Sequence, residues 1–146
     1  CSYLWRLHES GKLELDFEPL ALTIGYHTPC HTRAVSPEVS GQNLLKLIPG
    51  LIVRHLDQGC SGMAGTFGLK RNNFRSSLRA GRGLIRSLRD ESILIGATEC
   101  SACKLQMRQG TSKPTVHPIK LLALAYGLMP EIANLFDRRG EELVTT

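Results

Sequence analysis

The chain has 146 residues, of which 42% are hydrophobic and 21% are charged. A chain of this size and composition can bury a core of its own without disulfide staples. No apolar run approaches the roughly 20 residues of a membrane span, and no secretory signal is visible. We therefore expect a single domain, residues 1–146, that works in the cytoplasm. Because the chain opens on Cys1, we expect it to be the carboxyl-terminal fragment of a longer protein.

The predicted elements alternate between strands and helices along the chain. Short apolar runs predict strands at 20–26, 51–53 and 92–97, with a short fourth strand at 115–116. Helical spacing and stop signals predict helices at 2–10, 40–47, 72–89, 103–109 and 118–127, and one more beyond Pro130. This alternation is typical of a three-layer, Rossmann-like α/β domain with a small parallel sheet and right-handed crossovers.

Four cysteines follow the predicted strands and are the most informative residues of the chain. Cys30 lies in the loop after the first strand, Cys60 in a glycine-rich loop after the second, and Cys100 and Cys103 after the third. In an open parallel sheet the loops at the carboxyl ends of the strands meet in one crevice. Converging thiols in a chain of this kind indicate an iron–sulfur or zinc site rather than disulfides.

The positions of the four cysteines also allow two explanations that involve no metal. A lone Cys-x-x-Cys motif also occurs in redox pairs and by chance, and free cysteines are often small buried hydrophobic residues. The glycine-rich loop favours the metal site, because Gly62 and Gly65 allow backbone amides to approach and to donate to cluster sulfurs. His27 and His31 flank Cys30 and either contact a cluster or cap the loop.

Four motifs in order resemble a known family, over about residues 20–130. They are Tyr26-His-Thr-Pro-Cys30-His, Gly59-Cys60-Ser-Gly-Met-Ala-Gly-Thr-Phe-Gly68, Cys100-Ser-Ala-Cys103, and His117-Pro118 with Ala125-Tyr126-Gly127. The chain thereby resembles the cysteine-rich CCG domain, which is found in the B subunit of heterodisulfide reductase, in the C subunit of anaerobic glycerol-3-phosphate dehydrogenase, and in FAD-linked 2-hydroxyacid dehydrogenases. The glycine-rich stretch looks most like the dehydrogenase branch.

The resemblance implies an iron–sulfur electron-transfer domain of a flavin-linked dehydrogenase that relays electrons to a quinone or another acceptor. The FAD is expected on a partner domain, because this chain has no Gly-x-Gly-x-x-Gly after a first strand. The family usually has two adjacent cysteines where this chain has Cys60 and Ser61. The remaining four thiols match an ordinary [4Fe–4S] cube, so we interpret them as the ligands in place of a five-cysteine, non-cubane centre.

Two residues near these motifs receive structural interpretations. Cys1 lies at the edge of an amphipathic helix and is interpreted as an inert thiol rather than a fifth ligand. His117 precedes a proline at a strand–helix turn, which favours a structural role.

The net charge of +5 comes from one segment. Residues 70–89 carry seven basic side chains and no acidic one, whereas the rest of the chain has 11 basic and 13 acidic residues. On a helix over 71–89 the arginines share one arc, and Phe74, Leu78, Ile85 and Leu88 are expected to face the core from the adjacent arc. The arginine face is either a solvated surface or a docking surface for an acidic partner or an anionic membrane. No aromatic residue lies among the arginines in that arc, so we expect no nucleic-acid binding.

Three functions therefore remain open. The leading one is the electron-transfer part of an oxidoreductase, without turnover of its own. The alternatives are a zinc-stabilised interaction module and a thiol enzyme of the heterodisulfide reductase type. The location expected is the cytoplasm, with peripheral contact at the inner face of the membrane.

Overall fold

A parallel sheet forms the centre of the computed structural model, which describes residues 1–36, 38–56 and 58–137. Within these residues the strand order is β2 (Ile52–His55), β1 (Thr23–His27), β3 (Ile95–Thr98) and β4 (Thr115–Val116). All neighbours run parallel, and His27 lies opposite Thr98 across the β1–β3 pair. The predicted small parallel sheet is confirmed, with strand ends displaced by up to three residues.

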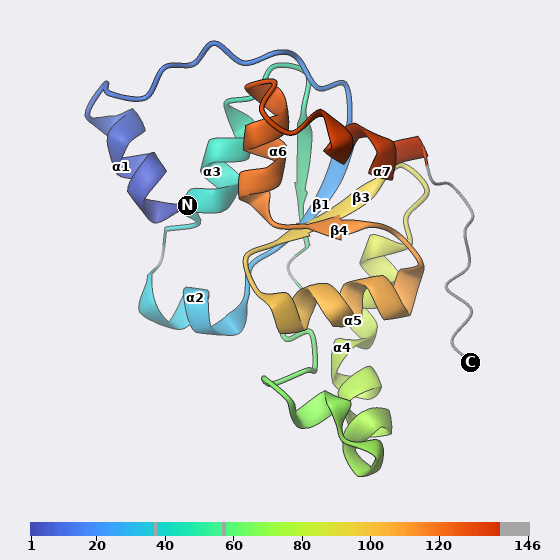
Figure 1. Ribbon diagram of the computed structural model, residues 1–146. Coiled ribbons are helices and arrows are strands. Elements are labelled where there is room, and N and C mark those ends of the chain that lie inside the picture. Colours follow the sequence, from blue (N-terminus) through green and yellow to red (C-terminus); the bar gives the residue numbers. More distant parts are fainter. Residues whose placement is uncertain (37, 57, 138–146) are drawn as a thin grey trace.

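Helices connect the strands and cover both faces of the sheet (Figure 1). Their bounds are α1 (Ser2–Glu9), α2 (Cys30–Val35), α3 (Ser40–Lys46), α4 (Phe74–Leu88), α5 (Ser101–Thr111), α6 (Pro118–Ala125) and α7 (Asn134–Asp137), with 3₁₀ turns η1 (Phe67–Leu69), η2 (Arg71–Asn73) and η3 (Pro130–Ala133). The predicted helix beyond Pro130 corresponds to η3 and α7, and its polar end lies outside the described residues.

Two hydrophobic clusters hold the three layers together. On one face, Ile24 and Tyr26 of β1 pack with residues of α3 and α6 such as Leu45 and Leu121. On the other face, a smaller cluster joins α4 and α5, and Met107 is its α5 member. Burial of this apolar area is the dominant favourable term in folding. The predicted three-layer α/β class is thus confirmed, and both faces of the sheet are covered, as parallel sheets require.

Three local expectations are corrected. Cys30 is the first residue of helix α2, whereas the sequence predicts that it lies in a loop. The long helix begins at Phe74 rather than residue 72, after the separate turn η2. Phe74 itself is 47% exposed and does not face the core. The buried positions of α4 are Ser77, Gly81, Leu84, Ile85 and Leu88.

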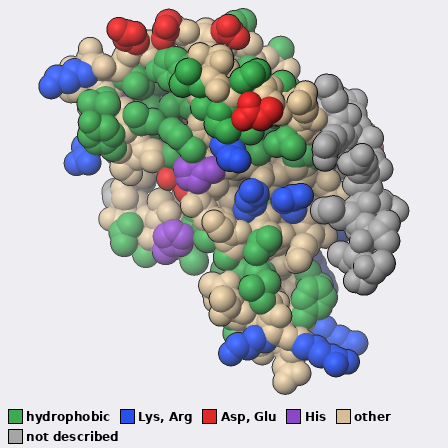
Figure 2. Space-filling view, in the orientation of Figure 1, with side chains coloured by type: hydrophobic (Ala, Val, Ile, Leu, Met, Phe, Trp, Pro, Cys, Tyr) green, Lys and Arg blue, Asp and Glu red, His purple; other side chains and the backbone are tan. Residues whose placement is uncertain are grey.

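The segment from η1 to the first turns of α4 projects from the body of the fold (Figure 1). Lys and Arg side chains gather at this end of the molecule in Figure 2. In this segment Lys70, Arg71 and Arg75 are exposed. In the described part of the chain, no single helix has the length and apolar character needed to cross a membrane. One pair of helical segments, Pro118–Ala125 and Pro130–Phe136, reaches these criteria together by length and composition, but is bent by 115°.

Candidate metal centre

Each of the four cysteines lies just beyond the carboxyl end of a strand. Cys30 is the first residue of α2, three positions after β1 ends, and is exposed. Cys60 is half-buried in the loop that follows β2. Cys100 caps the amino end of α5, and Cys103 is buried in the first turn of that helix. Because β1 and β3 are neighbours in the sheet, these loops open on the same edge.

Cys103 is the buried sulfur of the group, and two of the other three cysteines lie near it. Its Sγ accepts a hydrogen bond of 3.1 Å from the hydroxyl of Ser61, and both residues are buried. Burial raises the pKa of the Cys103 thiol above its ordinary value, the Ser61 hydrogen bond opposes the rise, and the nearby Cys100 and Cys60 thiols add to it. Three of the four thiols therefore lie close enough to interact electrostatically. A cation bound there would remove the cost of placing thiolates together.

The loop after Cys60 is held against α4 by backbone contact. The amide of Gly62 donates to Sγ of Cys60 over 3.2 Å. Gly62 has φ +90°, and a Cβ on it would lie 2.0 Å from the carbonyl oxygen of Ser77. Reciprocally, a Cβ on Gly81 would lie 2.2 Å from the carbonyl oxygen of Ser61. The two glycines let the loop and the helix touch, and this contact places Ser61 and Cys60.

Cys30 joins this group through a surface hollow. The hollow is open to solvent and is lined by Cys30, Arg33 and Ala34 from α2, with Gly59 and Cys60 from the facing loop. A group held by the four sulfurs would therefore have an exposed side at Cys30 and a buried side at Cys103.

His27 is a fully buried histidine at the end of β1. Burial, followed by the charge of Arg33, lowers its pKa to about 4, and the backbone of Leu56 acts in the opposite direction. Neither ring nitrogen has a hydrogen-bond partner of ordinary geometry among the described residues, and the same holds for the hydroxyl of Thr98 opposite it. Unpaired buried polar atoms are rare in proteins and indicate that something else, such as a water molecule or a ligand, pairs with them.

The other predicted site residues are less closely involved. His31 is exposed on α2, and Gly65 is also exposed, so that a Cβ added to it would meet no atom within 4 Å. His117 caps α6, because its Nδ1 accepts a hydrogen bond from the amide of Ile119. Nothing in the sequence except its place beside Cys60 points to Ser61 as a partner of Cys103. Gly81 was also missed, although its position inside a helix indicates close packing.

These residues form a donor set that fits an iron–sulfur cluster. Four thiols supply the usual ligands, and the Gly62 amide and the Ser61 hydroxyl are donors to two of the sulfurs. In the described ranges, no three of the four sulfurs lie within 4.8 Å of one another. Tetrahedral zinc with bonds of about 2.3 Å needs sulfurs about 3.8 Å apart. The wider spacing suits ligands that bind different iron atoms.

Comparison with known proteins agrees with this arrangement. Residues 24–108, which include the four cysteines, match the CCG cysteine-rich domain family, and the chain belongs to that family. It is 40% identical over 123 residues to the C subunit of the anaerobic glycerol-3-phosphate dehydrogenase of Escherichia coli strain K12, and equally to that of strain O157:H7. The alignment covers 84% of this chain but only 31% of either relative. No solved structure matches the chain.

Proposed function

We propose that the chain is an iron–sulfur domain that transfers electrons within a flavin-linked dehydrogenase of the glycerol-3-phosphate or 2-hydroxyacid type. The observation that carries the proposal is the collection of four thiols from three successive strand ends at one edge of the sheet. Similarity to one component of a dehydrogenase supports the assignment to an oxidoreductase. The chain spans about a third of that relative, so the flavin and the substrate site are expected on other parts of the enzyme.

The bound cluster would accept and release one electron at a time. The protein contributes the environment that sets its potential. The Ser61 hydroxyl and the Gly62 amide donate hydrogen bonds to ligand sulfurs, which stabilises the more negative, reduced state. The buried side at Cys103 excludes water, whereas the exposed side at Cys30 leaves a short path to a partner. A cluster buried on one side and exposed on the other can exchange electrons with a partner through its solvent-facing ligand, Cys30.

The proposed cluster is a [4Fe–4S] cube with Cys30, Cys60, Cys100 and Cys103 as ligands. Ser61 occupies the position of the family's second adjacent cysteine, and in this chain its hydroxyl is engaged with Cys103. That contact supports a role as a hydrogen-bond donor rather than as an iron ligand. It also disfavours disulfide-cleaving chemistry of the heterodisulfide reductase type.

Anaerobic reconstitution with iron and sulfide tests the proposal. The expected result is about four irons and four sulfides per chain, a broad absorption band in the visible region, and loss of both on changing any one of the four cysteines to alanine. Changing Cys1 to alanine is the matched control and should leave the iron content unchanged. A protein that binds one zinc through the four cysteines and takes up no sulfide would refute the cluster and support the zinc-stabilised module.

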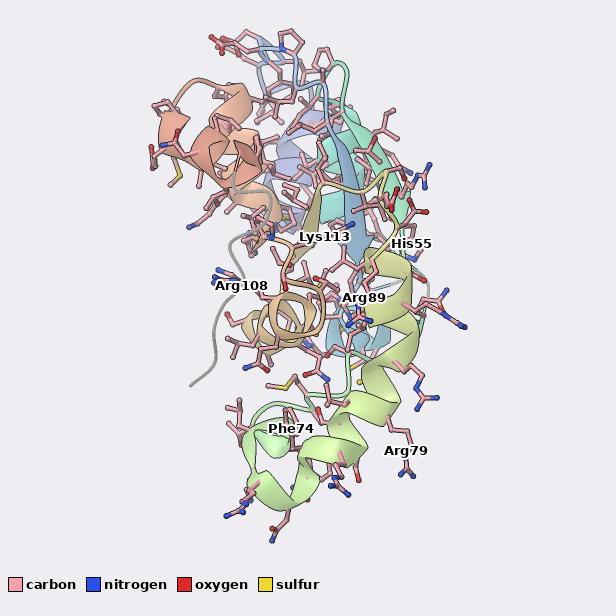
Figure 3. All side chains as sticks on the ribbon, turned by 90° about the vertical axis from the view of Figure 1, so that its right-hand side faces the viewer. His55, Phe74, Arg79, Arg89, Arg108 and Lys113 are labelled. Carbon is pink, nitrogen blue, oxygen red and sulfur yellow. The ribbon has the colours of Figure 1, made fainter. Side chains whose placement is uncertain are left out.

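The partner surface proposed is the arginine face of α4. Arg75, Arg79, Arg82 and Arg86 are exposed, and Arg79 points away from the sheet in Figure 3. Such a face fits an acidic surface on the flavin-containing domain, and it would also hold the protein at the anionic inner face of the membrane. We therefore propose a cytoplasmic protein with peripheral membrane contact and no affinity for nucleic acid.

A further inference from the structure

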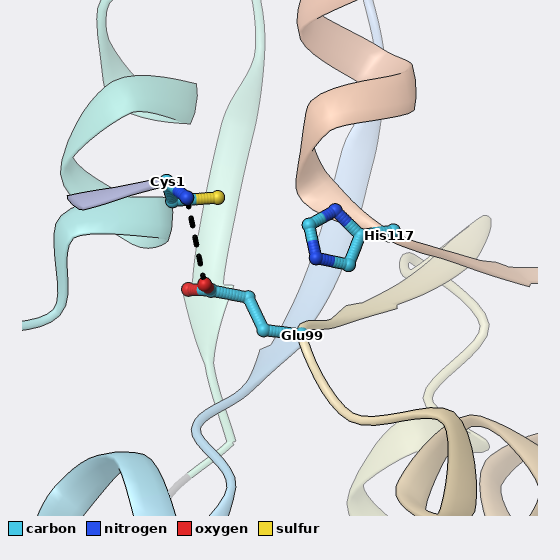
Figure 4. Close-up of side chains that lie close together, drawn as sticks. All are labelled: Cys1, Glu99 and His117. Carbon is cyan, nitrogen blue, oxygen red and sulfur yellow. Dashed lines mark ion pairs between the residues drawn. The ribbon is translucent and has the colours of Figure 1, made fainter. Parts of the chain in front are cut away.

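A second group of side chains that could bind a metal ion lies outside the sulfur site. One ligand atom from each of Cys1, Glu99 and His117 lies within 4.8 Å of the other two. Cys1 stands at the start of α1, Glu99 follows β3, and His117 joins β4 to α6. Figure 4 shows the sulfur of Cys1 directed toward the imidazole of His117, with the carboxylate of Glu99 beside both. Among the described residues, this is the one set of three that is so compact.

We propose that Cys1, Glu99 and His117 bind a zinc ion. Thiolate, imidazole and carboxylate are all zinc ligands, with bonds of about 2.0–2.3 Å. Those bonds place tetrahedral ligands about 3.4–3.8 Å apart, so the separations between the three ligand atoms, all within 4.8 Å, need to shorten by no more than about 1.4 Å. A thiolate and a carboxylate together neutralise the double charge of the ion. Three protein ligands leave the fourth position to water.

Buried neighbours hold the carboxylate of Glu99 in place. The hydroxyl of the fully buried Tyr26 donates to Oε1 of Glu99 over 2.8 Å. A Cβ on Gly41 of α3 would lie 2.3 Å from that same carboxylate oxygen, so glycine is needed for the approach. Outer hydrogen bonds of this kind orient metal ligands in proteins.

The imidazole has to change its hydrogen bonding when the metal binds. Nδ1 of His117 accepts from the amide of Ile119 over 3.2 Å, so the neutral ring carries its proton on Nε2. Binding through Nε2 requires the ring proton to move to Nδ1, which then can no longer accept from the Ile119 amide, so the cap is lost. One helix cap contributes far less free energy than a zinc site. The exchange is therefore favourable. Zinc binding also releases the proton of the Cys1 thiol, because the ligand is the thiolate.

The ion would fasten a weakly attached helix. No residue of α1 is buried, although Leu4 packs partly against the core. A metal bound to Cys1 joins the start of α1 to the end of β3 and to the start of α6. Glu99 directly precedes Cys100, so the same ion would also brace the loop of the sulfur site.

X-ray absorption at the zinc edge of the intact protein, with its iron–sulfur site filled, tests the proposal without any substitution. The chain is produced with a residue ahead of Cys1, so that a free amine cannot serve as a ligand. We expect one zinc per chain with a single sulfur at about 2.3 Å and nitrogen or oxygen neighbours at about 2.0–2.2 Å. A shell of sulfur alone, or less than one zinc per two chains after zinc addition and desalting, overturns the proposal.

Substitutions then assign the ligands. Cys1→Ser, Glu99→Gln and His117→Asn each remove one ligand, and asparagine retains the ability to cap α6. Each should weaken zinc binding by more than about 100-fold, since losing only an outer partner of a ligand costs about 10–100-fold. Tyr26→Phe should show that smaller loss. Iron content should stay constant in all four variants, which separates this site from the cluster.

His8→Asn, elsewhere on α1, is the control and should bind zinc as the unmodified chain does. Zinc should also raise the melting temperature of the unmodified chain but not that of Glu99→Gln. Equal zinc affinity in the unmodified chain and all three ligand variants would overturn the assignment.

Discussion

The hydroxyl of Ser61 donates a hydrogen bond of 3.1 Å to Sγ of Cys103, and so joins the loop after β2 to the first turn of α5. Both residues are buried, with 2% and 6% of their surface exposed. A buried donor directed at a ligand sulfur stabilises added negative charge on a cluster more than the same donor would in water. We therefore expect Ser61 to act on the reduction potential of the proposed cluster as a hydrogen-bond donor rather than as an iron ligand.

Ser61→Ala should retain about four irons per chain and shift the cluster's reduction potential to a more negative value, because one sulfur loses its donor. A redox titration followed by electron paramagnetic resonance measures the shift. Ser101→Ala, at an exposed position of the same helix, is the control and should leave the potential unchanged. Loss of iron in Ser61→Ala would identify the serine as a ligand and contradict the cubane assignment.

Gly62→Ala and Gly65→Ala form a matched pair, because both glycines have positive φ values of +90° and +65°. Only at Gly62 would the new Cβ collide, at 2.0 Å from the Ser77 carbonyl. We expect Gly65→Ala to lower the free energy of unfolding by about 1 kcal/mol through backbone strain alone. Gly62→Ala should cost clearly more and reduce iron incorporation, because Cys60 is displaced. Urea titration and iron analysis measure both effects, and similar results for the two variants would contradict the close contact with α4.

Acid should destabilise the metal-free, reduced chain through His27. The pKa of this histidine falls from 6.5 in the unfolded chain to about 4 in the fold, so protonation favours unfolding. The contribution to stability is complete above pH 6.5 and is lost as the pH falls through about 4, by up to about 3 kcal/mol. Urea unfolding at pH 7 and pH 4.5 measures this change. His27→Gln should flatten the dependence, whereas the control His8→Gln should keep it; an equal slope in both would contradict the prediction.

Reversing Arg75, Arg79 and Arg82 to glutamate should slow electron transfer from the flavin partner without loss of iron. These side chains are exposed on the outer face of α4, so the core is unaffected. The unmodified protein should also lose rate as salt is added, because exposed charges are screened within about 8–10 Å at ordinary ionic strength. The control reverses Arg6, Lys12 and Lys46, which are equally exposed on other segments and change the net charge by the same amount. Equal electron-transfer rates in the two triple variants would show that the arginine face is a solvated surface with no role in binding the flavin partner.

Periodicity in the sequence predicted the sheet and most helices, because apolar runs and glycine or proline stops are local signals. Helix α2 was missed since its six residues include β-branched Thr32 and Val35 and carry no apolar stripe. Phe74 was assigned to the core because its position fits the helical period, but the sheet ends before it and leaves it exposed. The cysteines could be found from their place after the strands. The Ser61–Cys103 and Tyr26–Glu99 contacts join residues 42 and 73 positions apart, and depend on packing that no local pattern contains.

Gly62 and Gly81 bring the loop after Cys60 and helix α4 into contact through their backbones. Where backbone rests on backbone, the spacing between loop and helix is fixed by peptide geometry, and side chains have no part in setting it. The outer surface of α4 is thereby free to vary in charge and shape without moving Cys60. Related proteins could then differ in the charge and shape of that helix surface while the sulfur site stays the same.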